Sequence, residues 1–543
     1  MKIRYYLLAA CGSLLGLAAC VEDKGSYDEI PINQVTAEGL QESYSVMAGV
    51  TELNITPTIT GTILGNDDSQ YQYTWYACDG SDAHNHFVLG NEKELHTVID
   101  LAPANYQLYL IINDTSTGQE WIISNMTLNV NTPLSRGFYV FGDKEDGTVG
   151  MDFLSMPYAD APQIDDTADD TIMVRDIFTN QRGLRGAQNL IFTGNNGLST
   201  AVINLWAVTE DGSYKIENSI QESSVFDVDE TYDDNVVFHT TYDIQRPVKV
   251  LDQYPHQTVG GTAAQVSNRG YVTEEGVYAG AVNNGFESFG NPINRYNLNE
   301  SENFFRCYKN PFYYANSYSV RLVVLYDMDN NRFVNTVGAT GAVSAFSPVM
   351  CATIAETSAT YFPWDQNQVR RTIVYGENTP YYYSYALMKD MDNNENFYIY
   401  MMYVYSSRPQ QYGCFDFTTA QATELDQASQ YAILGEYPIL LYAVDNKLYM
   451  FNYNERTTAT LLKEFDGEIT YLSTEWISSD EGGNIAVCTY NPSAEPDMRG
   501  TIYKFNIGQS LTLDPIQTDF NRSEFVYHTP LRVKKIEYRD CQR

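Results

Sequence analysis

Basic residues are scarce in this chain of 543 residues, which has 33 Lys and Arg against 69 Asp and Glu and a formal net charge of −36. A protein this negative repels phosphate backbones and anionic headgroups, so nucleic acid is excluded as a partner. Beyond the first twenty residues, no apolar run approaches the roughly 18 residues that a membrane-spanning helix needs. Hydrophobic residues still make up 43% of the chain, which excludes global disorder.

Signatures of catalysis are also missing. The chain has six histidines and contains no nucleophile elbow, Walker loop, H-E-x-x-H or dinucleotide-binding fingerprint. It has no CxxC pair, which disfavours a zinc ribbon or a redox motif. We therefore predict no cofactor, no metal site and no catalytic residue, and favour a non-enzymatic protein.

Six cysteines remain after residue 20, widely scattered along the chain. In an exported protein they could form disulfides in any of 15 pairings, or serve as small buried apolar residues. They are Cys78, Cys307, Cys351, Cys414, Cys488 and Cys541.

The start of the chain carries an export signal. Lys2 and Arg4 precede an uncharged run from Tyr5 to Ala19, which leads into Cys20. A positive end, an apolar stretch and a small-residue cleavage site are typical of a secretory signal. We predict a signal peptide at residues 1–19 and a polar tether at residues 20–30.

Composition predicts an almost all-β protein, because the chain is rich in strand-forming aromatic residues (44 Tyr and 24 Phe) and in turn-forming Gly (36). Within residues 31–132, about seven short alternating segments, with Trp75 on a middle one, indicate an immunoglobulin-like β-sandwich. Residues 133–543 repeat longer Tyr-rich strand pairs, enough for about seven or eight blades of a β-propeller-like domain. A pair of β-sandwiches is the alternative for that region.

Two Asp- and Asn-rich patterns and a histidine pair deserve an interpretation. Asp327-x-Asp329-x-Asn331 and its echo beginning at Asp390 have the spacing that opens a calcium loop, but the Gly and Glu that complete such a loop are missing. We predict hairpin turns at both places. His84-Asn-His86 lies in a segment that we predict to be a surface loop.

Several motifs resemble a known family. Cys20 behind small residues is similar to the lipobox of bacterial lipoproteins, whose signal is cut before an acylated cysteine. The YTWY segment around Trp75 and the pattern Tyr106-x-Leu108-x-Leu110 resemble PKD-like domains. Together with C-x-x-D-K-G-S-Y-D from Cys20, they resemble the PKD-like family of surface lipoproteins of Bacteroidetes nutrient-uptake loci. The resemblance covers the anchor, tether and first domain well, and the remainder only in general character.

This resemblance implies a location and partners. Lipidation of Cys20 would anchor the protein in the outer membrane, and Glu22 and Asp23 resemble the export signal that places such lipoproteins on the cell exterior. Members typically accompany a TonB-dependent transporter and its lipoprotein lid, which implies an accessory role in binding a glycan or peptide. Two alternatives stay open: a propeller-type polysaccharide hydrolase or lyase, and a structural or adhesion component of the transporter complex.

Aromatic runs supply the candidate ligand-binding residues. Aromatic rings pack against the apolar faces of sugars, and a Tyr hydroxyl adds a hydrogen-bonding group. We predict Trp364, as an exposed platform, together with Tyr381 and Tyr383. The alternative is that alternating tyrosines simply form a half-buried sheet surface.

Overall fold

The structure is a computed structural model. It describes residues 32–49, 51–79, 82–132, 134, 136–156, 172–192, 205–216, 236–238, 249–254, 268–274, 276–283, 286–289, 292–297, 304–314, 323–337, 350–354, 356, 362–365, 370–405, 408–474, 482–517 and 524–540. The predicted signal peptide, Cys20 and the tether lie outside the described residues.

The chain divides into two compact units. The first comprises Met1–Tyr44, Glu52–Val98 and Asn105–Asn129, and the second comprises Ser45–Thr51, Ile99–Ala104 and Val130–Arg543. Within the described residues the regular structure is β-strand, apart from two short 3-10 helices, η4 (Leu425–Gln427) and η6 (Pro496–Met498). A helix long and apolar enough to cross a membrane is absent from this described part of the chain.

The N-terminal sandwich is formed by nine strands. They are β1 (Val35–Glu38), β2 (Ser43–Met47), β3 (Glu52–Ile55), β4 (Thr58–Gly61), β5 (Tyr71–Asp79), β6 (Asp82–Gly90), β7 (Leu95–Val98), β8 (Ala104–Asp114) and β9 (Glu120–Asn131). A five-stranded sheet has the order β2-β9-β8-β5-β6, and β1 pairs with β4 and β3 with β7 in two small sheets. Nine strands are present where about seven were expected, and the alternating segment at residues 53–59 is divided between β3 and β4.

The alternation of the sequence sets which residues enter the core of this sandwich. Along β8, Tyr106, Leu108, Leu110 and Ile112 are buried, as the period of two for a strand requires. Trp75 on β5 is fully buried, and its indole Nε1 donates a hydrogen bond to the backbone oxygen of Glu92 at 3.1 Å. Its polar N–H is therefore satisfied inside the core, and the prediction of a sandwich around Trp75 is confirmed.

The prediction of a loop around the histidine pair is wrong. Asp82–Gly90 form strand β6, which pairs antiparallel with β5. Backbone pairing in this hairpin outweighs the turn preference of Asp, Gly and Asn in the segment. His86 is exposed on β6, and its ring lies 5.8 Å from that of Tyr76.

The second unit contains seven β-sheets among its described residues. The first sheet is formed by β10 (Arg136–Asp143), β11 (Val149–Ser155), β12 (Ile172–Val174) and β37 (Arg532–Asp540), and the second by β13 (Ala187–Phe192), β14 (Leu205–Thr209) and β15 (Gly212–Ile216). The third sheet is formed by β16 (Val236–Phe238), β17 (Val250–Tyr254), β18 (Asn268–Thr273), β19 (Val277–Asn283) and β20 (Phe286–Phe289). The fourth sheet is formed by β21 (Val324–Asp327), β22 (Arg332–Val337) and β23 (Met350–Thr353).

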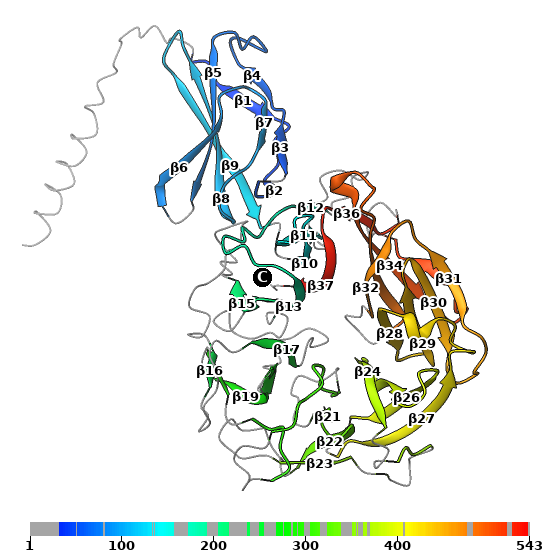
Figure 1. The fold of residues 1–543 in the computed structure, drawn as a ribbon. Helices are drawn as coiled ribbons and strands as arrows, with labels where there is room; N and C mark the ends of the chain where they lie inside the picture. The colour runs from blue at the N-terminus through cyan, green and yellow to red at the C-terminus, as the bar shows by residue number, and fades with distance from the viewer. Residues whose placement is uncertain are drawn as a thin grey trace, which may run out of the picture. The chain divides into compact units, whose positions relative to one another are not determined.

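The last three sheets follow one another along the chain. They are formed by β24 (Arg371–Asn378), β25 (Tyr383–Asp390), β26 (Asn396–Tyr403) and β27 (Gln410–Thr418); by β28 (Gln430–Leu434), β29 (Ile439–Val444), β30 (Lys447–Asn452) and β31 (Thr460–Glu464); and by β32 (Glu468–Thr474), β33 (Asn484–Tyr490), β34 (Gly500–Ile507), β35 (Leu513–Pro515) and β36 (Val526–Thr529). Neighbouring sheets lie side by side in chain order (Figure 1).

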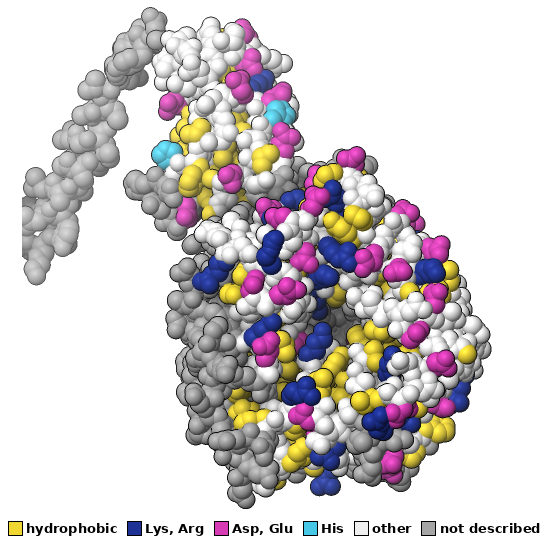
Figure 2. Space-filling view, viewed as in Figure 1, with side chains coloured by type: hydrophobic (Ala, Val, Ile, Leu, Met, Phe, Trp, Pro, Cys, Tyr) yellow, Lys and Arg dark blue, Asp and Glu magenta, His cyan; other side chains and the backbone are white. Residues whose placement is uncertain are grey.

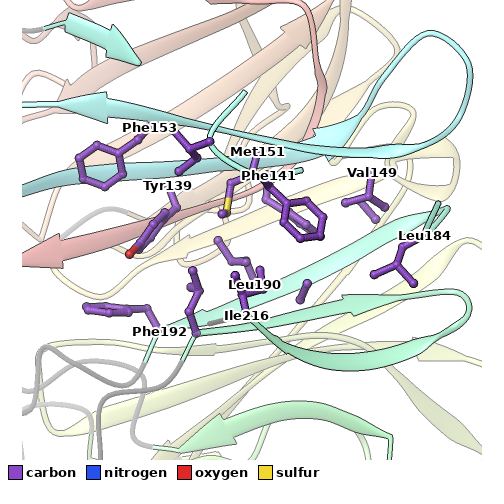
Figure 3. Close-up of a cluster of buried hydrophobic side chains, with 14 of the residues drawn as sticks. Tyr139, Phe141, Val149, Met151, Phe153, Leu184, Leu190, Phe192 and Ile216 are labelled. Atoms are coloured by element: carbon purple, nitrogen blue, oxygen red, sulfur yellow. The ribbon is translucent and has the colours of Figure 1, made fainter. Parts of the chain in front are cut away.

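A hydrophobic cluster joins each sheet to the next. Between the first and second sheets, Tyr139, Phe141 and Met151 pack against Leu190 and Phe192 (Figure 3). Equivalent clusters join the second sheet to the third and so on to the seventh. A further cluster joins the seventh sheet back to the first. Seven sheets joined in a closed ring form a seven-bladed β-propeller, which confirms the predicted fold class.

The ring is closed by strands from opposite ends of the second unit. The first sheet has the order β12-β11-β10-β37, so its innermost strand comes from the C-terminal region. β37 pairs antiparallel with β10, from Arg136 opposite Asp540 to Asp143 opposite Arg532. This pairing makes the first blade a composite of the two ends of the domain.

Both calcium-like patterns are hairpin turns, as predicted. One Asp327 carboxylate oxygen accepts the backbone N–H groups of Asp329 and Asn330 at 2.9 and 3.0 Å. Asp390 does the same for the backbone of Asp392 at 2.8 Å and that of the next residue at 3.0 Å. The two turns connect β21 to β22 and β25 to β26, so the sequence echo marks the same hairpin in successive blades.

The five cysteines in the described part of the chain form no disulfide with one another, and Cys541 lies outside the described residues. Cys78, Cys351 and Cys488 are buried, and Cys307 and Cys414 are half-buried. Within these residues the cysteines therefore act as small apolar side chains.

Closure of the ring predicts an unequal response to two glycine substitutions. A Cβ on Gly142 of β10 would lie 2.2 Å from the backbone oxygen of Arg532, so a side chain there forces β10 and β37 apart. We expect Gly142→Ala to lower the free energy of unfolding by about 2–4 kcal/mol, measured by urea denaturation. Gly413→Ala on β27 is the matched control, because its Cβ would make an ordinary 3.5 Å contact with Phe415. Equal effects of the two substitutions would contradict the prediction.

Candidate functional site

A cavity lies along the axis of the propeller. Its volume is about 540 Å³, within the range of small-molecule sites, and residues from the innermost strand of every blade line it. These strands are β37, β13, β17, β24, β28 and β32, with residues 308–313 serving in the fourth blade. In that blade Phe312 bridges to Val324 of β21. Figure 2 shows the hollow, with Lys and Arg side chains around it.

Bulges shape the wall of this axial channel. Five of the innermost strands carry one extra residue relative to the strand they pair with, which increases the local twist and redirects side chains. The extra residues are Gln188, Leu251, Val374, Thr470 and Lys534. The residue directly after each bulge lines the channel: Asn189, Asp252, Tyr375, Tyr471 and Lys535. The same irregularity thus presents one side chain from each of five blades, and these five residues are of four different types.

One side of the channel is aromatic. Tyr375, Tyr431 and Tyr471 come from three successive blades, and the rings of Tyr375 and Tyr431 lie 5.8 Å apart at 31°. The ammonium group of Lys535 lies 6.0 Å from the centre of the Tyr471 ring. Burial raises the pKa of Tyr431 to about 12, so its hydroxyl stays protonated at physiological pH. The Tyr375 hydroxyl donates to Glu377 and the Tyr431 hydroxyl donates to the backbone oxygen of Ala428 at 2.7 Å, so these two tyrosines line the channel with their hydroxyls already held by the protein.

The second and third blades contribute polar groups. The Asn189 side-chain Nδ2 donates to the backbone oxygen of Leu251 at 3.0 Å and lies 3.5 Å from an Asp252 carboxylate oxygen. Asp252 is buried and accepts the backbone N–H of Gln253 at 2.9 Å. This side of the channel therefore contributes an amide and a carboxylate to its lining.

Glu377 is a carboxyl group of the channel whose pKa is strongly shifted. The Tyr375 hydroxyl donates to its Oε2, the Thr474 hydroxyl donates to its Oε1 at 3.2 Å, and the backbone N–H of Ile433 also hydrogen-bonds to it. Burial nevertheless raises the pKa of Glu377 to about 7, against the lowering effect of these donors and of Lys535. Three blades combine to hold this group near its point of ionisation at neutral pH.

Glu537 occupies the same place in the first blade that Glu377 occupies in the fifth, three residues after the bulge of its strand. It is buried and forms an ion pair with Lys535 at 3.4 Å. Asp252, Glu377 and Glu537 therefore place three carboxyl groups on one cavity. The sequence prediction singled out none of them, because 69 acidic residues offer no local sign of which ones reach the axis.

Trp364 is not the exposed platform that the sequence predicted. Its side chain is 4% exposed and lies between the fourth and fifth blades, stacked on Tyr400 at 4.4 Å and 16°. Its backbone N–H donates to the Gln411 side chain at 3.0 Å. The prediction of exposure is wrong because an apolar interface between blades covers the indole.

Tyr381 and Tyr383 are half-buried, and neither lines the channel. Tyr381 packs beside the loops of the next two blades, since a Cβ on Gly435 or Gly482 would lie 2.7 or 2.4 Å from it. The Tyr383 ring lies 4.6 Å from that of Tyr412. A role of these two tyrosines in ligand binding stays a prediction.

A metal site is not apparent in the described residues, where no group of three or more His, Cys, Asp or Glu side chains is placed to hold an ion. The channel offers hydrogen-bonding and stacking groups instead. Such a site can bind a small polar molecule and, through Glu377, exchange a proton with it.

Fold and channel together define an all-β protein in which a sandwich is followed by a seven-bladed propeller with a polar, tyrosine-lined axis. The sequence profile of a family described as PKD-like matches residues 20–188. That match covers the sandwich and continues through β10, β11 and β12 of the first blade. A search of curated proteins finds no match.

Solved structures give weak similarities. The β-propeller domain of Cps50 (Swd1) from Myceliophteria thermophila is 7% identical, with a TM-score of 0.35, covering 69% of this chain and 98% of that one. The extracellular domain of a putative hybrid two-component system from B. thetaiotaomicron is 8% identical, with a TM-score of 0.31, covering 84% and 51%. Both scores lie below 0.5, so the propeller assignment rests on the sheet order and clusters of this chain.

The pKa of Glu377 predicts a pH-dependent effect of its substitution. The folded-state value of about 7 lies above the 4.5 of an ordinary Glu, so ionisation weakens the folded state as pH rises from about 4.5 to 7. We expect Glu377→Gln to change stability little at pH 4 and to stabilise the protein by roughly 1–3 kcal/mol at pH 8, measured by urea denaturation. Glu455→Gln, at an exposed turn, serves as the control and should show no trend. A Glu377→Gln effect independent of pH would refute the assignment.

Burial of Trp364 predicts a structural role. Trp364→Ala removes a large side chain from the interface between two blades, so we expect a loss of about 3–5 kcal/mol in the free energy of unfolding. Trp364→Phe, which keeps an aromatic ring against Tyr400, should lose less. Unchanged denaturation midpoints would mean that the indole does not hold the blades together.

Proposed function

We propose that this protein is an outer-membrane surface lipoprotein that serves a TonB-dependent nutrient-uptake system by binding a glycan or peptide without catalysis. The observation that carries the proposal is the axial channel of about 540 Å³, lined by tyrosines and polar groups from all seven blades. The lipobox-like Cys20 and the PKD-like match at residues 20–188 support a location at the cell surface.

The chemistry of the channel suits a ligand with both apolar faces and hydroxyl groups. Tyr375, Tyr431 and Tyr471 offer ring faces on which a sugar can stack. Asp252 and Glu377 offer oxygens that accept hydrogen bonds from ligand hydroxyls, and Lys535 is a donor. A glycan end is therefore our preferred ligand, ahead of a peptide side chain.

A polysaccharide hydrolase or lyase is the second candidate, and Glu377 is the observation that favours it. A carboxyl group with a pKa of about 7 is partly protonated at neutral pH, as a general acid must be. Glu537 in the same cavity supplies a second carboxyl group, and glycoside hydrolysis commonly uses such a pair. Glu537, however, is ion-paired with Lys535, which suits a structural or binding role equally well.

Binding and turnover can be measured on the same samples. Residues 21–543 are titrated with a panel of glycans and peptides by calorimetry, and each mixture is then analysed for cleavage products. We expect the unmodified protein to bind at least one glycan without releasing cleavage products. Relative to it, Tyr431→Ala and, at pH 8, Glu377→Gln should each bind at least ten-fold more weakly. Glu455→Gln should bind normally, since its exposed side chain lies outside the channel.

Other outcomes of this experiment decide between the candidates. Products that disappear in Glu377→Gln would establish the enzyme in place of the binding protein. Failure of every glycan and peptide to bind would overturn the proposal. Co-purification with the transporter despite that failure would leave a structural component of the complex as the function.

A further inference from the structure

Three tyrosines form a partly exposed aromatic corner away from the channel. The ring of Tyr405 lies 4.4 Å from Tyr382 and 4.8 Å from Tyr314, and Tyr314 lies 5.7 Å from Tyr382. Tyr382 and Tyr405 are 47% and 54% exposed, while Tyr314 is half-buried behind them. The rings meet at 40°, 81° and 43°, so they form an open corner instead of a closed stack.

Further tyrosines extend this corner. Tyr403 lies 6.4 Å from Tyr382 and 5.6 Å from Tyr383, which in turn contacts Tyr412. We call the continuous set the tyrosine cluster; its members are Tyr314, Tyr382, Tyr383, Tyr403, Tyr405 and Tyr412. None of the six lines the axial cavity.

The topology of two blades brings the tyrosine cluster together. Tyr382 and Tyr383 lie where β24 turns into β25, and Tyr403 and Tyr405 lie where β26 leads towards β27. In an antiparallel sheet these two connections lie at the same end of the strands, and Tyr383 is paired directly with Tyr403, so the side chains gather at one end of the fifth blade. Tyr314 reaches them from the innermost segment of the fourth blade.

Core packing does not account for the exposed members. Tyr314 and Tyr383 pack against the clusters between blades, but Tyr382 and Tyr405 leave about half of their surface in water. Adjacent exposed aromatic rings are a surface that water solvates poorly, and such a patch commonly marks a place where something binds.

The chemistry of the cluster selects the kind of ligand. Phenol rings are uncharged, and burial together with the neighbouring hydroxyls of Tyr382 and Tyr405 raises the pKa of Tyr314, so its hydroxyl stays a donor. The formal charge of −36 repels acidic polymers. Angled rings with hydroxyl edges match a molecule that has flat C–H faces rimmed by hydroxyl groups.

We propose that the tyrosine cluster is a second binding site, which holds a neutral polysaccharide chain by stacking its sugar rings on Tyr382 and Tyr405. The inference rests on the proposed function only in taking glycans as ligands, because it concerns a surface separate from the channel. A chain held here is bound along its length, whereas the channel accepts a ligand of limited size.

The test compares variants of the cluster with variants of the channel. The mature chain is run in native gels containing neutral polysaccharides and titrated with the matching short oligosaccharides. We expect Tyr382→Ala and Tyr405→Ala each to weaken polysaccharide binding by about three- to ten-fold, and the double variant by more. Tyr382→Phe, which keeps the ring, should retain most of the affinity.

Controls separate loss of a ring from loss of fold. Phe362→Ala removes another exposed aromatic side chain, 59% exposed and outside the cluster, and should bind polysaccharide normally. Denaturation midpoints of the cluster variants should match those of the unmodified protein, since the two rings are half in water. A variant that binds weakly and also unfolds early is replaced by the corresponding Tyr→Gln change, read in the same assay.

The outcomes distinguish this proposal from the proposed function. Polysaccharide binding unchanged in the double variant overturns the tyrosine cluster as a site and leaves the channel proposal standing. Binding lost in the double variant but unchanged in Glu377→Gln supports the cluster and counts against the channel. Self-association or peptide binding that disappears in the double variant, with no effect on polysaccharide, would overturn the carbohydrate assignment.

Discussion

The pairing of β37 with β10 is the interaction on which the propeller depends. Each hydrophobic cluster joins only two neighbouring blades, so an open ring would leave one apolar face uncovered at each end. β37 completes the first blade, and its residues Val533, Ile536 and Tyr538 belong to the cluster in which the first and seventh blades cover each other's apolar faces. Phe138 and Tyr538 contact each other there at 5.2 Å, and buried Arg539 donates to the Tyr139 hydroxyl across 400 positions of sequence.

The channel exists only because the ring is closed. Glu377 receives hydrogen bonds from its own strand, from Ile433 in the sixth blade and from Thr474 in the seventh. Lys535, which lowers the pKa of that carboxyl, comes from the closing strand itself. A shift between blades would therefore change the electrostatics of the site as well as its shape. Bulges at similar places in five innermost strands direct five side chains of four types, Asn, Asp, Tyr and Lys, into the channel.

Local patterns in the sequence were sufficient for the fold class. Alternation predicted the inward residues of β8, the isolated Trp75 predicted the sandwich core, and the paired Asp-x-Asp-x-Asn patterns predicted two equivalent hairpins. These features depend on residues close in the chain. The site depends on residues far apart: nothing near Glu377 or Glu537 in the sequence marks them as neighbours of one cavity. Trp364 was predicted to be exposed and is buried, because a Trp beside Pro and Asp in the sequence gives no sign that the next blade covers it.

The composite first blade also constrains the order in which the strands of the domain can pair during folding. β10, β11 and β12 are made early, yet their sheet lacks its innermost strand until β37 has been made about 400 residues later. In the interval β10 has an unpaired edge, the kind of edge that recruits strands from other molecules. Pairings this distant are slow to form, so native structure here arises late and cooperatively. A chain that lacks β37 would therefore leave the edge of β10 exposed, and that edge could pair with strands of other molecules.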